Sequence, residues 1–201
     1  RHSNRSFRNS RKNNNNFYDF THSSGRRDGS DYFCWRNLKS NRLEISVSVI
    51  PRFLFTEACE YTNSFLSFFP KISVILNIDE DHLDFFKDLE DIRNSFHRFA
   101  KLLPKDGTLV INGDIDRLDE ITGDLDCKIV TYGTNPSATY HAANVTHDEL
   151  GEASFDLVKN GEFVDRISLS VSGDHNVSNA LAALAVADLL ECKCFRCQKG
   201  I

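Results

Sequence analysis

The chain has 201 residues, enough for one large domain or two small ones, with 40% hydrophobic and 26% charged residues. This composition is ordinary for a soluble folded protein, and the net charge of −5 argues against a nucleic-acid partner. The sequence contains neither an apolar run near the roughly 18 residues that span a bilayer nor an apolar signal segment. We therefore expect no membrane partner and a cytoplasmic location.

Residues 1–42 differ in composition from the rest of the chain. They are rich in arginine, serine and asparagine, with four consecutive asparagines at 13–16, and they hold few aliphatic residues. A basic arm that binds nucleic acid is one interpretation, but no recognised nucleic-acid module follows. We predict that residues 1–42 are disordered or poorly packed. The chain contains no methionine, which suggests a fragment of a longer protein.

Two acidic segments come next, separated by a predicted strand. "TEACEY" (56–61) carries Glu57 and Glu60, which could share a helix face or be ordinary surface carboxylates. "PKISVILNI" (70–78) is a nearly continuous apolar run, which is typical of a strand buried on both faces of a parallel sheet.

"DEDHLD" (79–84) follows the carboxyl end of that strand and concentrates carboxylates around His82. Ligands bind at the carboxyl edge of such sheets. Imidazole and carboxylate groups can hold Mg²⁺ or Mn²⁺ when phosphate supplies further oxygens. A solvated acidic turn is the alternative interpretation.

Alternating helices and strands follow. Residues 88–103 predict a helix, with Asp88 as N-cap and Pro104 after the last turn. Its apolar residues fall three and four apart on one face: Leu89, Ile92, Phe96, Phe99, Ala100 and Leu103. The sequence then predicts a strand, a short helix and a strand at 107–113, 114–122 and 127–133. This rhythm indicates an α/β fold with a largely parallel sheet flanked by helices.

The pattern changes at residue 139. Residues 139–172 predict an antiparallel β segment, with a hairpin turn at the Asn-Gly pair 160–161. Residues 179–190 predict a buried helix, because they are apolar on nearly all sides.

Polar residues precede this helix. Asp174 is interpreted as its N-cap. His175, Asn176 and Asn179 could instead hydrogen-bond an adenine edge. These polar residues could therefore cap the helix or bind a nucleotide base.

Several of these segments together resemble the central, ATP-binding domain of the Mur ligases. "EACEYTNSFL", "NIDEDHLD" and "SGDHNVSNALAALAVA" are similar to the family's motifs, in the family's order, between about Thr56 and Leu190. The form of the first motif resembles the member that adds alanine. The resemblance implies that residues 43–201 are an incomplete central domain with a phosphate-loop-type fold.

The resemblance also implies roles for individual residues. Glu57 and His82 would be catalytic ligands of Mg²⁺ beside the ATP phosphates, and Glu60 occupies a motif position of less certain role. His175, Asn176 and Asn179 would lie at the adenine. The implied reaction uses ATP to convert the carboxylate of UDP-N-acetylmuramate to an acyl phosphate, which L-alanine then attacks, in peptidoglycan synthesis.

The family's domain opens with a strand and a glycine-rich phosphate loop, where this chain has its asparagines. Asparagine codons AAC, read one nucleotide later, become ACA, which encodes threonine. The same shift can turn residues 1–22 into an apolar strand followed by Gly-Thr-His-Gly-Lys-Thr. We therefore expect residues 1 to about 36 to be an out-of-frame translation, with the frame returning between Arg36 and Thr56. The printed chain alone is then expected to be inactive.

The cysteine-rich stretch "CKCFRC" (192–197) permits the same explanation, since a shift there leads into the following residues. A structural zinc site is the alternative, but such sites normally need four ligands. The remaining cysteines are expected to be free thiols.

The sequence is also compatible with other functions. The chain could derive from another Mur ligase or from a folylpolyglutamate-type amide ligase. It could also be a non-catalytic nucleotide-binding fragment or a translated pseudogene.

Overall fold

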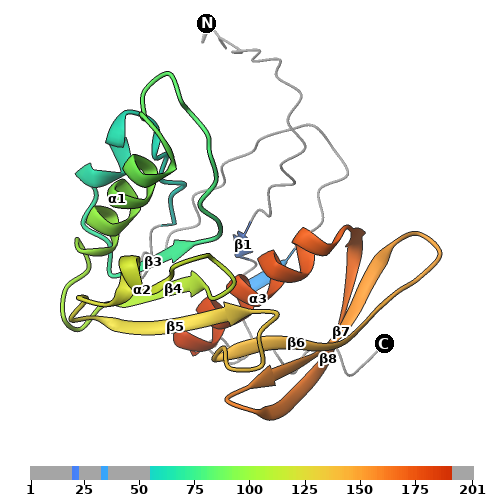
Figure 1. Cartoon of the computed structure of the whole chain (residues 1–201). Coiled ribbons are helices and arrows are strands. Elements are labelled where there is room, and N and C mark those ends of the chain that lie inside the picture. The colour runs from blue at the N-terminus through green and yellow to red at the C-terminus, as the bar shows by residue number, and fades with distance from the viewer. Residues whose placement is uncertain (1–19, 23–32, 36–54, 192–201) are drawn as a thin grey trace, which may run out of the picture. The chain divides into compact units, whose positions relative to one another are not determined.

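The structure is a computed structural model that describes residues 20–22, 33–35 and 55–191 (Figure 1). The expectations about the phosphate loop, the return of the frame and the cysteine stretch fall outside these residues. Strands β1 (Phe20–His22) and β2 (Phe33–Trp35) pair antiparallel. The sequence did not predict this pair. It belongs to a separate unit of the chain.

The larger unit is built on a six-stranded sheet whose strands lie in chain order, β3 to β8. The pairs β3–β4, β4–β5 and β5–β6 are parallel, whereas β6–β7 and β7–β8 are antiparallel. The predicted α/β fold with an antiparallel segment is therefore confirmed. The strands are β3 (Ile72–Ile75), β4 (Thr108–Asn112), β5 (Lys128–Gly133), β6 (Tyr140–His147), β7 (Glu152–Lys159) and β8 (Glu162–Ser172).

The predicted antiparallel segment at 139–172 corresponds to β6, β7 and β8, which pair antiparallel with one another. The first residues of β6 also run parallel to the end of β5. Tyr140 lies opposite Tyr132, and His141 lies opposite Gly133. Because the strands overlap only at these two pairs, the short connection between them needs no crossover helix.

Within the described residues, three α-helices and one 3₁₀ segment accompany the sheet. α1 (Leu89–Ala100) begins at the predicted N-cap, where the Asp88 carboxylate accepts a hydrogen bond from the Asp91 amide at 2.9 Å. α2 (Asp119–Thr122) is shorter than predicted, and α3 (Asp174–Leu189) is longer. The segment η1 (Tyr61–Ser67) precedes β3.

The helices cover both faces of the sheet (Figure 1). Ile92 and Phe99 of α1 pack with Leu109 and Ile111 of β4 in one buried cluster, as the periodicity predicted. Val110, between these two β4 residues, is buried on the opposite face, where α3 contacts β4 and β5. In the described part of the chain, no helix has the length and apolarity that a membrane crossing requires.

Strand β3 departs from its predicted burial. Ser73 and Ile75 are buried, but Val74 and Leu76 are 40% and 48% exposed. The prediction that both faces of this strand are covered is therefore wrong for the described residues. β3 forms the edge of the described sheet, so it has one strand neighbour there instead of two.

The predictions for the β7–β8 turn and for the start of α3 had different outcomes. Asn160 and Gly161 adopt φ angles of 50° and 81°, so the predicted hairpin turn between β7 and β8 is confirmed. The prediction that Asp174 caps α3 is wrong. Gly173 occupies the N-cap position, and Asp174 is the first helical residue, paired with His147 at 2.8 Å.

Candidate active site

Glu60, Asp81 and His82 form a cluster that could hold a metal ion. Their ligand atoms all lie within 4.8 Å of one another. The His82 Nε2 atom lies 3.5 Å from the Glu60 Oε1 atom and 3.9 Å from the Asp81 Oδ2 atom. The side chains of His82 and Glu60 are 32% and 29% exposed, so solvent and a ligand can reach both. The cluster joins two segments that are about twenty residues apart in sequence.

The loop after β3 places His82 in this cluster. The Ile78 and Phe86 side chains on either side of His82 are 7% and 2% exposed, and they anchor the loop in the core. Between these anchors, the His82 carbonyl accepts hydrogen bonds from the Phe85 and Phe86 amides at 2.9 and 3.0 Å. The loop is therefore fixed on both sides of the histidine.

His82 itself has a left-handed backbone, with φ at 54°. This conformation is uncommon for residues other than glycine, and side chains held in it cluster at functional sites. The Asp81 Oδ1 atom accepts a hydrogen bond of 2.7 Å from the His82 amide. Asp81 thus supports the backbone of His82 as well as offering a carboxylate oxygen.

The segment on the other side of the cluster is η1, which Glu60 directly precedes. The Asn63 amide donates to the Glu60 carbonyl at 2.8 Å, and the Phe65 amide donates to the Cys59 carbonyl at 3.0 Å. Phe65 is 1% exposed and belongs to the core. These contacts fix the backbone that carries the Glu60 side chain.

Tyr61 bridges the two segments. Its hydroxyl donates to the Asp84 Oδ2 atom at 2.7 Å, and its ring centroid lies 4.7 Å from that of His82. The hydrogen bond to Asp84, reinforced by the negative charge of that carboxylate, raises the pKa of the Tyr61 phenol. The phenol therefore stays protonated and remains a donor at neutral pH.

The donor set suits a divalent cation. It offers two carboxylates and one imidazole, ligands that occur together around Mg²⁺ and Mn²⁺ when further oxygens complete the coordination. Among the described residues, no lysine or arginine forms an ion pair with Glu60 or Asp81. The negative charge at the cluster is thus not neutralised by a described basic side chain.

The two glutamates of the first motif occupy different surroundings. Glu60 lies beside His82, as described above. Glu57 is exposed and is not a member of the three-residue cluster. Sequence spacing could not separate the two, because either carboxylate can follow a strand and approach the loop.

The three residues at the start of α3 also differ in accessibility. His175 is exposed and Asn179 is half-buried, whereas Asn176 is fully buried. The Asn176 amide nitrogen donates to the Ser172 carbonyl at 2.7 Å, and its side-chain oxygen has no hydrogen-bond partner among the described residues. Gly173 leaves room for the His175 ring, since a Cβ atom there would lie 2.7 Å from the His175 Cε1 atom.

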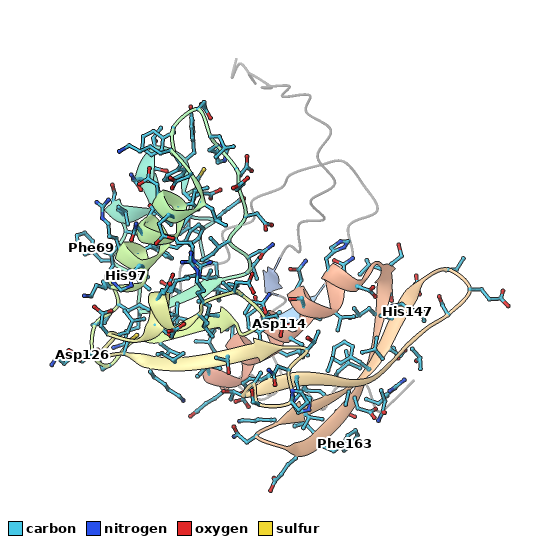
Figure 2. All side chains as sticks on the ribbon, viewed as in Figure 1. Phe69, His97, Asp114, Asp126, His147 and Phe163 are labelled. Atoms are coloured by element: carbon cyan, nitrogen blue, oxygen red, sulfur yellow. The ribbon has the colours of Figure 1, made fainter. Side chains whose placement is uncertain are left out.

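The carboxyl edge of the sheet carries two further polar residues that the sequence analysis did not single out. The Asn112 side-chain Nδ2 donates to the Leu76 carbonyl at 3.2 Å and links β4 to the loop after β3. Asp114, labelled in Figure 2, accepts a hydrogen bond from the Thr134 amide at 2.7 Å and links the ends of β4 and β5. Both residues stabilise the edge on which the candidate site is built.

Comparison with known protein families shows to which family the chain belongs. The family described as the Mur ligase middle domain matches residues 52–187. This chain belongs to the Mur ligase family. The resemblance inferred from the motifs is thus confirmed, and the Glu60–His82 cluster lies inside the matched region.

Two curated relatives of this Mur ligase chain are UDP-N-acetylmuramate–L-alanine ligases. The ligase of Lachnoclostridium phytofermentans is 55% identical over 144 residues, which cover 67% of this chain and 31% of the relative. The ligase of Lachnospira eligens is 53% identical over 134 residues, covering 66% and 29%. The chain therefore spans about three-tenths of the length of the curated relatives that it matches.

Solved structures of Mur ligases share the fold. The UDP-N-acetylmuramate–alanine ligase MurC from Thermotoga maritima aligns with a TM-score of 0.52 and 28% identity, covering 64% of this chain and 28% of the other. The UDP-N-acetylmuramate:L-alanyl-γ-D-glutamyl-meso-diaminopimelate ligase (MPL) from Neisseria meningitides aligns with a TM-score of 0.55 and 26% identity, covering 69% of this chain and 43% of the other.

Proposed function

We propose that this chain is part of an ATP-dependent ligase that joins L-alanine to UDP-N-acetylmuramate in peptidoglycan synthesis. The observation that carries the proposal is the Glu60–Asp81–His82 cluster within a region 55% identical to an alanine ligase. The implied partners are ATP, Mg²⁺ and the two small-molecule substrates, and the implied location is cytoplasmic.

The proposed reaction has two steps. The substrate carboxylate takes the γ-phosphoryl group of ATP, and ADP leaves. The amine of L-alanine then attacks the acyl phosphate, and phosphate leaves as the amide bond forms. A bound Mg²⁺ would neutralise charge on the phosphate oxygens.

In this proposal, Glu60 and His82 hold the divalent cation, and Asp81 adds a carboxylate at the same place. The support is their mutual distance and the absence of a described basic partner for the carboxylates. Glu57 stays a candidate ligand from the family resemblance, and comparing the two glutamates in solution decides between them.

The three residues at the start of α3 that the resemblance assigns to the nucleotide differ in accessibility. His175 and Asn179 are reachable and would contact the adenine. Asn176 is buried and bonded to Ser172, so its proposed task is to fix the turn that presents the other two.

A chimera tests the substrate assignment. Residues 55–191 would replace the matching segment of the Lachnoclostridium phytofermentans ligase, and phosphate release would be followed with UDP-N-acetylmuramate and ATP. We expect release to depend on L-alanine and to be lost in the His82→Ala chimera. A folded chimera that uses a different amino acid instead would overturn the alanine assignment.

A calorimetric titration tests nucleotide binding by the printed chain. A few hydrogen bonds of about 1 kcal/mol each cannot offset an association cost of at least about 4 kcal/mol, so binding should be no tighter than about millimolar. Restoring the shifted reading of residues 1–36 should tighten the binding of Mg-ATP clearly. Micromolar binding by the printed chain would show that the interpretation of its first residues is wrong.

A further inference from the structure

Tyr61 contacts both parts of the proposed metal site. It directly follows Glu60, and its ring lies against His82 with the two ring planes at 33°. Its hydroxyl reaches Asp84, two residues beyond the histidine, at 2.7 Å. One side chain thus connects the segment that carries the glutamate to the loop that carries the histidine.

The hydrogen bonds of the loop fix the backbone of His82 but leave its ring to other contacts. The Asp81 carboxylate and the Phe85 and Phe86 amides all bond to main-chain atoms of the histidine. The imidazole orientation depends on what lies beside the ring. Tyr61 provides a ring contact at 4.7 Å, close to the separations at which aromatic rings attract one another.

The surroundings of Tyr61 argue against a role in packing the core. Tyr61 is 38% exposed, whereas Phe65 on the same segment is 1% exposed and packs on α1. Thr62 and Asn63 between them have left-handed φ angles of 55° and 58°. This backbone reversal lets Phe65 enter the core while Tyr61 stays with the histidine loop.

We propose that Tyr61, held by Asp84, is a positioning residue that orients the His82 imidazole for metal binding. Phe85 supports the arrangement, because its ring packs edge-on against Tyr61 with a centroid separation of 6.0 Å. The metal-binding part of this inference rests on the proposed function. Orientation of the histidine by Tyr61 stands on the contacts alone.

Two variants separate the ring of Tyr61 from its hydroxyl. Tyr61→Leu removes the aromatic ring, and Tyr61→Phe keeps the ring but removes the bond to Asp84. Tyr140→Phe is the matched control, because the Tyr140 hydroxyl also donates to an aspartate, Asp188, at 2.6 Å, away from the cluster. Heteronuclear NMR spectra confirm that each variant is folded.

The first measurement is the chemical shift of the His82 ring protons in the full chain, identified by their loss in His82→Ala. An aromatic ring whose face lies over these protons shifts them upfield, so Tyr61→Leu should move them downfield. Tyr61→Phe should move them less, and Tyr140→Phe should not move them. Unchanged His82 shifts in Tyr61→Leu would overturn the proposal.

The second measurement is Mn²⁺ affinity, with Mn²⁺ alone as the probe and free ion followed by electron paramagnetic resonance. Loss of a residue that supports a metal ligand typically weakens metal binding by about 10–100-fold, and we expect Tyr61→Leu to lie near the lower value. Tyr61→Phe should bind more tightly than Tyr61→Leu. Wild-type affinity in Tyr61→Leu would contradict the inference.

His82→Ala distinguishes this inference from the proposed function. If that variant binds Mn²⁺ as the wild type does, the metal-site assignment fails. The ring-proton shifts then still decide whether Tyr61 orients His82.

Discussion

Two tyrosine–aspartate hydrogen bonds of almost equal length lie in opposite surroundings. Tyr61 bonds to Asp84 at 2.7 Å on the exposed histidine loop, and Tyr140 bonds to Asp188 at 2.6 Å between β6 and α3. Tyr140 is only 3% exposed, and Lys159 also donates to Asp188 at 2.7 Å. Burial raises the pKa of Tyr140 first, and the aspartate raises it further.

This difference in exposure distinguishes a candidate ligand-binding region from a region that stabilises the fold. The histidine loop region, which we define as residues 55–67 and 79–86, carries uncompensated carboxylates and left-handed backbone at Thr62, Asn63 and His82. The sheet region, β4 to β8 with α3, contains the ion pairs Lys159–Asp188 and Arg166–Asp156 and fully buried side chains such as Leu181. Substitutions in the first should change ligand binding, and substitutions in the second should change stability.

The largest expected effect is a loss of stability when a leucine of the sheet region is changed to alanine, compared with the same change in the histidine loop region. Leu181→Ala in α3 removes a side chain that is 1% exposed and should cost about 2–5 kcal/mol of unfolding free energy. Leu83→Ala, at a position 56% exposed, should cost less than about 0.5 kcal/mol. Urea unfolding followed by circular dichroism measures both. Equal costs would remove the distinction between the regions.

The turn into α3 should show the next largest effect. Gly173 has a φ of 105°, and an added Cβ would collide with the His175 ring, so Gly173→Ala should cost about 1–3 kcal/mol. Gly161→Ala is the control, because its φ is 81° but its Cβ would meet nothing within 4 Å. Thermal unfolding compares them. A larger loss at Gly161 would show that the contact with His175 is unimportant.

The next prediction concerns the Mn²⁺ affinity of variants at the two glutamates of the histidine loop region. Glu60→Gln should weaken Mn²⁺ binding by about tenfold, equivalent to about 1.4 kcal/mol, because a charged donor beside His82 is lost. Glu57→Gln should change it little, since Glu57 is not in the cluster. The opposite order of affinities would restore Glu57 as the ligand that the family resemblance implied.

The smallest expected effect is the acid dependence of the sheet region. Desolvation raises the pKa of Asp188, but hydrogen bonds from Lys159 and Tyr140 outweigh it and lower the pKa overall. Asp188 therefore stabilises the fold above its unfolded pKa of about 3.9, and this stabilisation is lost as pH falls through the folded value.

The measurement is the unfolding free energy of Asp188→Asn and of the wild type at pH 6 and pH 3. At pH 6, the unfolding free energy of the wild type should exceed that of Asp188→Asn by less than about 1 kcal/mol, because the Lys159–Asp188 pair is partly exposed. This difference between the two proteins should become smaller at pH 3. A gap that widens in acid would contradict the direction of the pKa shift.

The sequence by itself determined features that depend on neighbouring residues. Asp88 was recognisable as a cap because it precedes a helical pattern, and the Asn160–Gly161 turn because few other pairs accept two positive φ angles. The apolar face of α1 followed from its spacing. Ordered motifs also sufficed to identify the Mur ligase family.

Only the tertiary structure decided which residues meet across long sequence separations. The contacts of His82 with Glu60 and Tyr61 depend on how the chain reverses at η1, where Thr62 and Asn63 have left-handed backbones and the β-branched Thr62 rarely adopts this conformation. Local patterns could not reveal these contacts, because the partners are brought together by packing.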